Sequence, residues 1–159
     1  MSQRCLPFVR SVWESFRANS GLEPRYLRIT SARPGTVNFE LDIRKEHTNR
    51  LAILHGGTIA SMVDLGGSLA VASRGLFATG VSTDLNVTYL NSGGKVGDTI
   101  RAEVVCDKFG KTLAYTSIKF TNASDELVAR GSHTKYVSFA WKDANNIVEE
   151  LSPKGGESK

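Results

Sequence analysis

Three polar features of the sequence could take part in chemistry because of where they lie. Asn49 closes a polar stretch, His55-Gly56-Gly57 leads into an apolar segment, and Asp64 lies within that segment. The start of a helix offers unpaired backbone N–H groups at the positive end of the helix dipole. A glycine N–H and the amide of Asn49 could together hold the oxygen of a polarised carbonyl. One such donor is typically worth about 10² to 10³ in rate.

Asp64 lies seven or eight residues beyond the two glycines, which is on the order of 11 Å along a helix axis. A carboxylate among Met62, Val63 and Leu65 is costly to remove from water unless it has polar partners. A shielded carboxylate suits a general base or a nucleophile, although a structural hydrogen-bonding role is equally compatible with composition alone. It could reach a carbonyl group held near the helix start, particularly in a site shared between two subunits.

Each of these residues also has an ordinary structural interpretation. His55 alone is more often a structural histidine than a catalytic one, the glycines could form a turn, and Asn49 could be a loop residue. As metal ligands, His47, His55 and Asp64 lack the short paired spacings of zinc sites, so we expect no metal. No Gly-x-Ser-x-Gly elbow occurs, which leaves a serine triad without support.

The apolar segment has the period of a helix. Across residues 56–74, apolar and small side chains recur at spacings of three and four. Most positions on every side are apolar or small, so we expect this helix to be buried nearly all round. The pair Gly66-Gly67 costs roughly 1 kcal/mol per residue against alanine, which indicates close packing of another backbone. Gly75 would end the helix.

Alternating apolar and polar side chains predict an antiparallel sheet. In the second half of the chain these runs lie about a dozen residues apart with short turns, as in a meander. One sheet that must cover one apolar helix will curl around it. The sequence therefore predicts an α+β fold, with a curved antiparallel sheet wrapped around one long buried helix. The predicted strands cover residues 26–32, 37–43, 81–89, 100–106, 113–121 and 127–139.

The 159 residues fit one domain with a segment at either side. Residues 1–21 are predicted to form an amphipathic, arginine-rich helix, which we favour as the first helix of the domain, with a mitochondrial targeting segment as the alternative. Residues 22–140 form the domain itself. Residues 141–159 form a C-terminal tail whose end we expect to be disordered.

Composition narrows the possible partners and compartments. Cys5 and Cys106 lie far apart, which fits neither a disulfide framework nor a metal site and indicates a reducing compartment. The net charge of +4 suits an anionic partner, but no nucleic-acid-binding signature accompanies it. Asp64 interrupts the longest uncharged stretch, so we expect no stable membrane insertion. The compartment is either cytoplasmic or mitochondrial.

These residues resemble the hot-dog thioesterase superfamily. Within it, the chain is similar to the thioesterase superfamily member 2 type, also called the acyl-coenzyme A thioesterase 13 type, of the phenylacetyl-CoA thioesterase branch. The likeness covers roughly residues 22–136, and its motifs occur in the expected order. They are His47-Thr-Asn49, Leu54-His-Gly-Gly57, Met62-Val-Asp64, Gly80-Val-Ser-Thr-Asp-Leu-Asn-Val-Thr-Tyr89, Gly110-Lys-Thr-Leu-Ala-Tyr-Thr-Ser117 and Gly131-Ser-His-Thr-Lys135.

The resemblance implies hydrolysis of medium- or long-chain fatty acyl-CoA, or aryl acyl-CoA, to free acid and CoA. Asp64 matches the catalytic carboxylate, which acts as general base on water or as nucleophile. Ser82 matches a serine that helps hold the water. The N–H of Gly56 and the amide of Asn49 would polarise the thioester carbonyl, and His55 would support that geometry.

The resemblance also implies how CoA binds and how subunits assemble. CoA would lie along a subunit interface as part of the substrate, so we expect no cofactor. Asp64 and Ser82 would come from neighbouring subunits, which implies a homodimer that usually pairs into a homotetramer. Lys95, Lys108 and Lys111 would contact phosphates. The residues implied to bind CoA are Gly57, Tyr89, Leu90, Asn91, Ser92, Gly93, Gly94, Lys95, Lys108, Phe109, Gly110, Lys111, Thr112, Leu113 and Tyr136.

The chain departs from the family in two places, and two other functions stay open. Residues 91–94 carry one more residue than the family's loop, and the tail from Trp141 extends past the usual end. One rival is a non-catalytic acyl-CoA-binding protein of the same fold. The other, which we favour less, is a hot-dog hydratase or dehydratase, whose usual His-Phe-Pro motif does not occur here.

Overall fold

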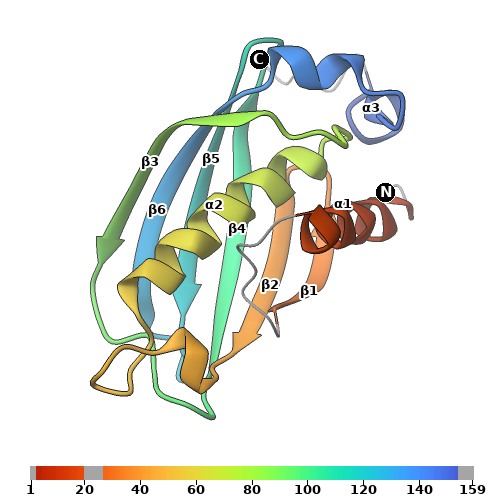
Figure 1. Ribbon diagram of the computed structural model, residues 1–159. Coiled ribbons are helices and arrows are strands. Elements are labelled where there is room, and N and C mark those ends of the chain that lie inside the picture. Colours follow the sequence, from red (N-terminus) through yellow and green to blue (C-terminus); the bar gives the residue numbers. More distant parts are fainter. Residues whose placement is uncertain (1–2, 20–26, 154–159) are drawn as a thin grey trace.

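A long helix lies along one face of a six-stranded antiparallel sheet, and the sheet curves around it (Figure 1). The structure is a computed structural model and describes residues 3–19 and 27–153. The arrangement agrees with the predicted curved sheet around one helix. The elements are α1 (Cys5–Asn19), β1 (Leu27–Arg33), β2 (Thr36–Asp42), η1 (Lys45–His47), α2 (Gly56–Ala72), β3 (Val81–Tyr89), β4 (Thr99–Phe109), β5 (Leu113–Thr121), β6 (Leu127–Tyr136), η2 (Ser138–Lys142) and α3 (Val148–Leu151).

The strand order in the sheet is β1-β2-β4-β5-β6-β3. Strands β4, β5 and β6 form the predicted meander. The meander prediction is wrong for β3, which pairs with β6 at the far edge of the sheet. The reason is that β4 already has β2 on one side and β5 on the other, so β3 takes the remaining edge of β6.

Glycine in α2 allows the helix to pack closely on the sheet. A Cβ added at Gly66 would come within 2.8 Å of Ile118 Cδ1 and 3.2 Å of Phe39 Cε1. Phe39 is one of the inward side chains of β2, which alternate with half-buried neighbours as predicted. The glycine pair therefore has the packing role that its cost in helix propensity indicated.

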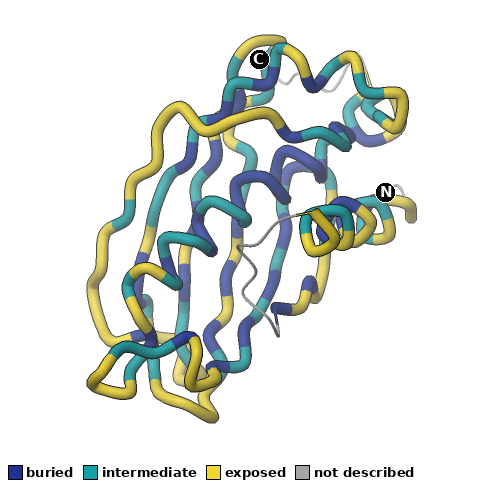
Figure 2. Tube along the Cα trace, in the orientation of Figure 1, coloured by how far each residue is buried: buried dark blue, intermediate teal, exposed yellow. Residues whose placement is uncertain are grey.

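The prediction that α2 is buried nearly all round is wrong for its first two turns. Residues 66–72 are buried, whereas Gly57 is exposed and Ser61 and Leu65 are half-buried (Figure 2). The C-terminal half of α2 packs on the sheet with α1 beside it, but among the described residues nothing covers the outer side of the first turns. Asp64 lies in this half-open part. No described helix is long and apolar enough to cross a membrane.

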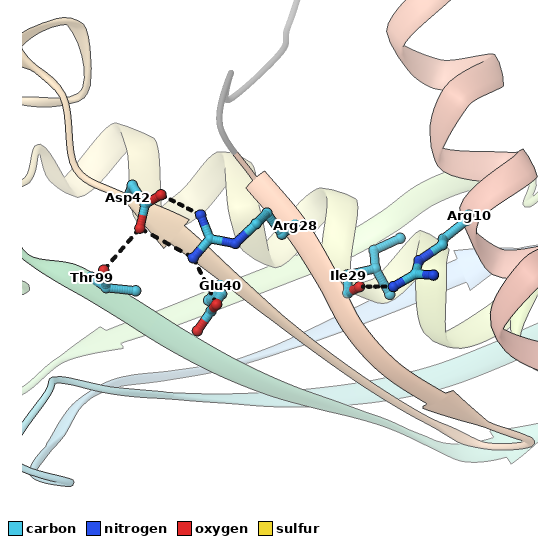
Figure 3. A network of polar contacts seen from close by, with 6 residues as sticks. All are labelled: Arg10, Arg28, Ile29, Glu40, Asp42 and Thr99. Carbon is cyan, nitrogen blue, oxygen red and sulfur yellow. Dashed lines mark hydrogen bonds and ion pairs between the residues drawn. The ribbon is translucent and has the colours of Figure 1, made fainter.

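Helix α1 packs beside α2 at the β1 edge of the sheet (Figure 1). Val9 and Val12 are fully buried there. Arg10 donates a hydrogen bond of 3.0 Å to the carbonyl of Ile29 in β1 (Figure 3). The predicted N-terminal helix is thus present and packed on the domain. Residues 1–2 and 20–26 lie outside the described residues, and the alternative of a targeting segment stays untested.

A charged network links β1, β2 and β4 (Figure 3). Arg28 of β1 pairs with Asp42 and also contacts Glu40 at 2.7 Å. Asp42 accepts a further hydrogen bond of 2.9 Å from Thr99 of β4. Hydrogen bonding from Arg28 is the largest cause that lowers the pKa of Asp42 below its ordinary value. The charged groups are partly exposed, so the network adds little stability.

The chain after β6 packs on the turn that follows α2. Strand β6 ends at Tyr136, and the prediction that it continues to residue 139 is wrong because η2 begins at Ser138. The N–H of Ile147 bonds to the carbonyl of Gly75, and Leu151 is buried. Residues 137–153 are called the C-terminal strap below. Most of the predicted disordered end, residues 154–159, lies outside the described residues.

We predict that Gly67→Ala destabilises the fold even though alanine favours a helix. The added Cβ would meet the ring of His133 and come within 2.8 Å of Thr116 Oγ1, and both side chains are buried. Overpacking of this kind typically costs about 1–3 kcal/mol, which outweighs a propensity gain of about 1 kcal/mol. Urea unfolding at one protein concentration measures the change. The matched control is Gly66→Ala, whose closest contact is the flexible end of Ile118, with the ring of Phe39 at 3.2 Å, and which should lose less. Wild-type stability in Gly67→Ala would contradict the prediction.

Candidate active site

Asp64 of α2, His133 of β6 and Ser82 of β3 form a cluster beside the helix. The Asp64 side chain is 51% exposed, and its Oδ1 lies 3.6 Å from Nε2 of His133. The same nitrogen lies 2.7 Å from the hydroxyl oxygen of Ser82. His133 itself is almost completely buried. The cluster therefore joins a carboxylate that is open on one side to an imidazole and a hydroxyl.

The family resemblance placed Asp64 and Ser82 on neighbouring subunits, and that expectation is wrong. Both side chains of one chain lie against the same nitrogen of His133. The physical reason is the sheet order. Because β3 pairs with β6, Ser82 stands opposite Lys135, only two residues from His133 and under the same helix.

His133 is the residue that sequence reasoning missed. Alternation along β6 brings His133 and Lys135 to the inward face, where both are buried. Gly67 leaves space for the imidazole, and the carbonyl of His133 accepts a 2.7 Å hydrogen bond from Thr116. The sequence feature that could have identified His133 is the motif Gly131-Ser-His-Thr-Lys135, because alternate residues of a strand share one face.

Lys135 lies next to this cluster and is also buried. Its ammonium donates to Ser68 Oγ at 2.5 Å and to Thr79 Oγ1 at 3.5 Å. Among the described residues no carboxylate forms an ion pair with it. Burial lowers the pKa of Lys135 from 10.5 to about 8, and the charge of Asp64 raises it. Lys135 is therefore a cation held mainly by hydroxyl groups.

The environment also keeps His133 neutral at ordinary pH. Burial is the largest cause that lowers the pKa of His133, and the positive charge of Lys135 lowers it further. The charges of Asp64 and Asp84 act in the opposite direction. At neutral pH the imidazole can therefore exchange a hydrogen bond with Ser82 without carrying a charge.

A second polar set lies at the start of α2. His55 is the N-cap, and its Nδ1 accepts a 2.7 Å hydrogen bond from the N–H of Gly57. This bond leaves the N–H of Gly56, rather than that of Gly57, as the donor at the helix start. Asn49 Oδ1 accepts from the N–H of Leu51 at 2.9 Å, so the amide Nδ2 is the group that Asn49 can offer to a ligand.

The structure separates this second set from Asp64. Gly56 and Asp64 are eight residues apart on one helix, which is about 12 Å. Tyr89 lies at the Gly56 end, where its hydroxyl donates a 2.8 Å hydrogen bond to the Gly56 carbonyl. Within one chain the two sets do not meet.

The residues implied to bind CoA also fall into two groups. Residues 89–95 lie beside the start of α2, where Lys95 forms a backbone bridge with Ile53. Residues 108–113 and Tyr136 lie at the opposite end of the sheet, where Leu113 stands opposite Tyr136 (Figure 1). One chain does not bring these groups together. No three His, Cys, Asp or Glu side chains in the described ranges are placed to hold a metal ion.

The sequence matches known thioesterases over the region that carries this geometry. The family model of the thioesterase superfamily matches residues 51–129. Acyl-coenzyme A thioesterase 13 of Homo sapiens is 42% identical over 112 residues, which cover 70% of this chain and 79% of that protein. The chain belongs to the thioesterase superfamily.

Two further matches extend the likeness of this thioesterase. A Schizosaccharomyces pombe protein named as a candidate esterase is 46% identical over 149 residues, which cover 92% of each chain. The crystal structure of thioesterase superfamily member 2 from Mus musculus superimposes with a TM-score of 0.73 at 33% identity, covering 86% of this chain and 99% of that one. The resemblance and the hot-dog fold class are confirmed, and the protein is a thioester hydrolase.

We predict that Lys135→Met makes this thioesterase more stable near pH 7. The pKa of Lys135 is about 8 in the folded chain and 10.5 ordinarily, so a folding penalty is present below pH 8 and is relieved as pH rises toward 10.5. Replacing a poorly compensated buried charge by an apolar side chain typically gains about 1–4 kcal/mol. Urea unfolding from pH 7 to 10.5 tests this: the rise expected for wild type should flatten in the variant. Lys119→Met, at an exposed position of β5, is the control. A less stable Lys135→Met would contradict the prediction.

Proposed function

We propose that this thioesterase hydrolyses fatty or aryl acyl-CoA to the free acid and CoA, with Asp64 as the catalytic carboxylate. The observation that carries the proposal is the half-exposed carboxylate of Asp64 beside the hydrogen-bonded pair of His133 and Ser82. The name of the Homo sapiens relative supports acyl-CoA as the substrate class. A thioester is already reactive, so a carboxylate, a water and an oxyanion site suffice.

The proposed chemistry has two forms that use the same residues. As general base, Asp64 takes a proton from water while the water oxygen bonds to the thioester carbon, and the carbon–sulfur bond then breaks. As nucleophile, Asp64 bonds to that carbon, the CoA thiolate leaves, and water cleaves the resulting anhydride. In both forms the thiolate takes up one proton, and no metal or redox cofactor is needed. Ser82, oriented by His133, would hold the water.

The oxyanion site would come from a second copy of the chain. The Gly56 N–H and Asn49 Nδ2 are available donors, but they lie two helical turns from Asp64 of the same chain. The edge strand β3 is exposed along nearly its whole length, with Val81 and Tyr89 among the large exposed side chains (Figure 2). An open edge is a template for pairing with another strand. Pairing there would place the helix start of one copy near Asp64 of the other.

The same assembly would unite the two groups of residues implied to bind CoA. Lys95 lies at one end of the sheet, and Lys108 and Lys111 lie at the other, and all three are exposed. Lysines on facing copies could contact the phosphates of one nucleotide. We propose a homodimer on these grounds and, by family likeness, a pairing of dimers into a tetramer. The proposed compartment is cytoplasmic or mitochondrial.

We predict that Asp64→Asn lowers thiol release from acyl-CoA by about 10³-fold or more, since the amide can neither take a proton nor attack the carbonyl. Thiol release from a series of acyl and aryl CoA thioesters measures kcat/KM. Asp107→Asn, which changes an exposed carboxylate of β4, is the matched control and should leave kcat/KM unchanged. Equal rates for Asp64→Asn and wild type would refute the assignment. Tight acyl-CoA binding by wild type without turnover would favour the non-catalytic binding protein.

We predict that two inactive variants restore activity when they share a dimer. In a hybrid of Asp64→Asn and Asn49→Ala chains, one shared site carries both changes and the other carries neither. The isolated hybrid should therefore have about half of the wild-type activity, and an unseparated mixture from random assembly of equal amounts about a quarter. Co-expression with two affinity tags isolates the hybrid, and thiol release is measured. The controls are the homodimers of each single variant, prepared with the same two tags, which should stay inactive. A hybrid with no activity would show that Asp64 and Asn49 of one chain serve the same site.

A further inference from the structure

Lys135 is a buried charge that the proposed reaction does not use. It follows His133 by two residues, so both side chains point from β6 toward α2. Its partners are the hydroxyls of Ser68 and Thr79, which leaves the charge uncompensated by any ion pair among the described residues. A buried cation of this kind is costly, and such groups cluster at functional sites.

The charge of Lys135 bears on the ionisation of His133. Nε2 of His133 lies 3.6 Å from the carboxylate of Asp64, so protonation of the imidazole would create an ion pair. The charged groups that act on His133 are Lys135 from the same strand, Asp64 from α2 and Asp84 from β3. Both carboxylates favour protonation. Besides burial, Lys135 is the group that opposes it.

An ion pair between His133 and Asp64 would impair the proposed reaction. A carboxylate held by an imidazolium is a weaker base and a weaker nucleophile, because its negative charge is already compensated. A neutral imidazole still holds the hydroxyl of Ser82 at 2.7 Å. The neutral form therefore keeps the geometry of the cluster without reducing the reactivity of Asp64.

We propose that Lys135 is a positioning residue whose buried positive charge keeps His133 neutral and so leaves Asp64 free of an ion pair. The inference rests on the proposed catalytic role of Asp64. Lys135 itself does not touch the substrate. Its position is set by Ser68, which lies one helical turn beyond Asp64 on α2, so the same helix carries the carboxylate and anchors the cation.

The first test measures the protonation of His133 directly and does not require the protein to hydrolyse acyl-CoA. The chain has three histidines, and NMR titration of their ring protons gives a midpoint for each. His133→Asn assigns the signal of His133. In Lys135→Met the midpoint of His133 should rise, whereas in Lys135→Arg, which keeps the charge, it should stay near the wild-type value. Lys119→Met is the matched surface control. An unchanged His133 midpoint in Lys135→Met would overturn the proposal.

The second test is the pH dependence of kcat/KM for acyl-CoA hydrolysis. In Lys135→Met the acid limb should move to higher pH, with a fall of about tenfold or more near pH 6, because loss of a neighbouring charge changes a protonation equilibrium by that order. Lys135→Arg should retain the wild-type limb. Lower activity at every pH with an unmoved acid limb would indicate a purely structural role and would overturn the proposal.

The two tests separate this inference from the proposed function. If no variant, wild type included, releases thiol, the hydrolysis of acyl-CoA fails as a proposal, while the NMR midpoints still decide whether Lys135 controls His133. Ser68→Ala is a milder second variant, because it removes the closest hydroxyl partner but keeps the amine. It should shift the His133 midpoint in the same direction as Lys135→Met, by a smaller amount, since an amine with fewer partners is less often protonated.

Discussion

The close packing of α2 over β6 is the constraint on which the site depends. An almost entirely apolar helix lies on a strand whose inward face carries an imidazole and an ammonium, His133 and Lys135. That contact is possible because Gly67 leaves room for the ring and because Ser68 offers a hydroxyl to the amine. Burial of polar groups beneath a helix is costly unless hydrogen bonds satisfy them, and here Nε2 of His133 bonds to Ser82 whereas its Nδ1 has no hydrogen-bond partner among the described residues. The same packing sets Asp64 beside His133.

Because α2 is straight, one chain cannot bring the oxyanion donors and the carboxylate of Asp64 to the same carbonyl. Because α2 holds Gly56 and Asp64 about two turns apart, the donors at its start and the carboxylate at its middle keep their separation whatever the ligand. An oxyanion donor and an attacking group must lie within a few hydrogen-bond lengths of one carbonyl. The exposed edge β3 and the uncovered first turns of α2 occur on the same side of the sheet (Figures 1 and 2). Assembly through that side would bring the donors at the helix start of one copy near Asp64 of the other, without any movement of the helix.

Most of the fold could be predicted from local patterns, whereas the site needed pairings that sequence patterns do not give. Alternation and helical spacing predicted every strand of the sheet and the central helix, because each pattern depends only on neighbouring residues. The partner of β3 depends on which sheet edge is free, and the exposure of Asp64 depends on what covers α2. His133 lies 69 residues from Asp64, so only the folded sheet brings them together. The resemblance assigned roles to Asp64 and Ser82 but none to His133, although His133 lies within one of its motifs.

The C-terminal strap supports the packing of α2 over β6. It bonds to the segment between α2 and β3 through Ile147 to Gly75 and through Asn146 to Phe77. That segment carries Thr79, a partner of Lys135, and leads directly into the strand of Ser82. A buried ammonium lowers stability, and functional sites commonly keep such costs because the rest of the fold offsets them. By fixing this segment, the strap stabilises the end of α2 where the uncompensated charge lies. The extension beyond β6 is thus part of what makes a buried lysine tolerable beside the reactive cluster.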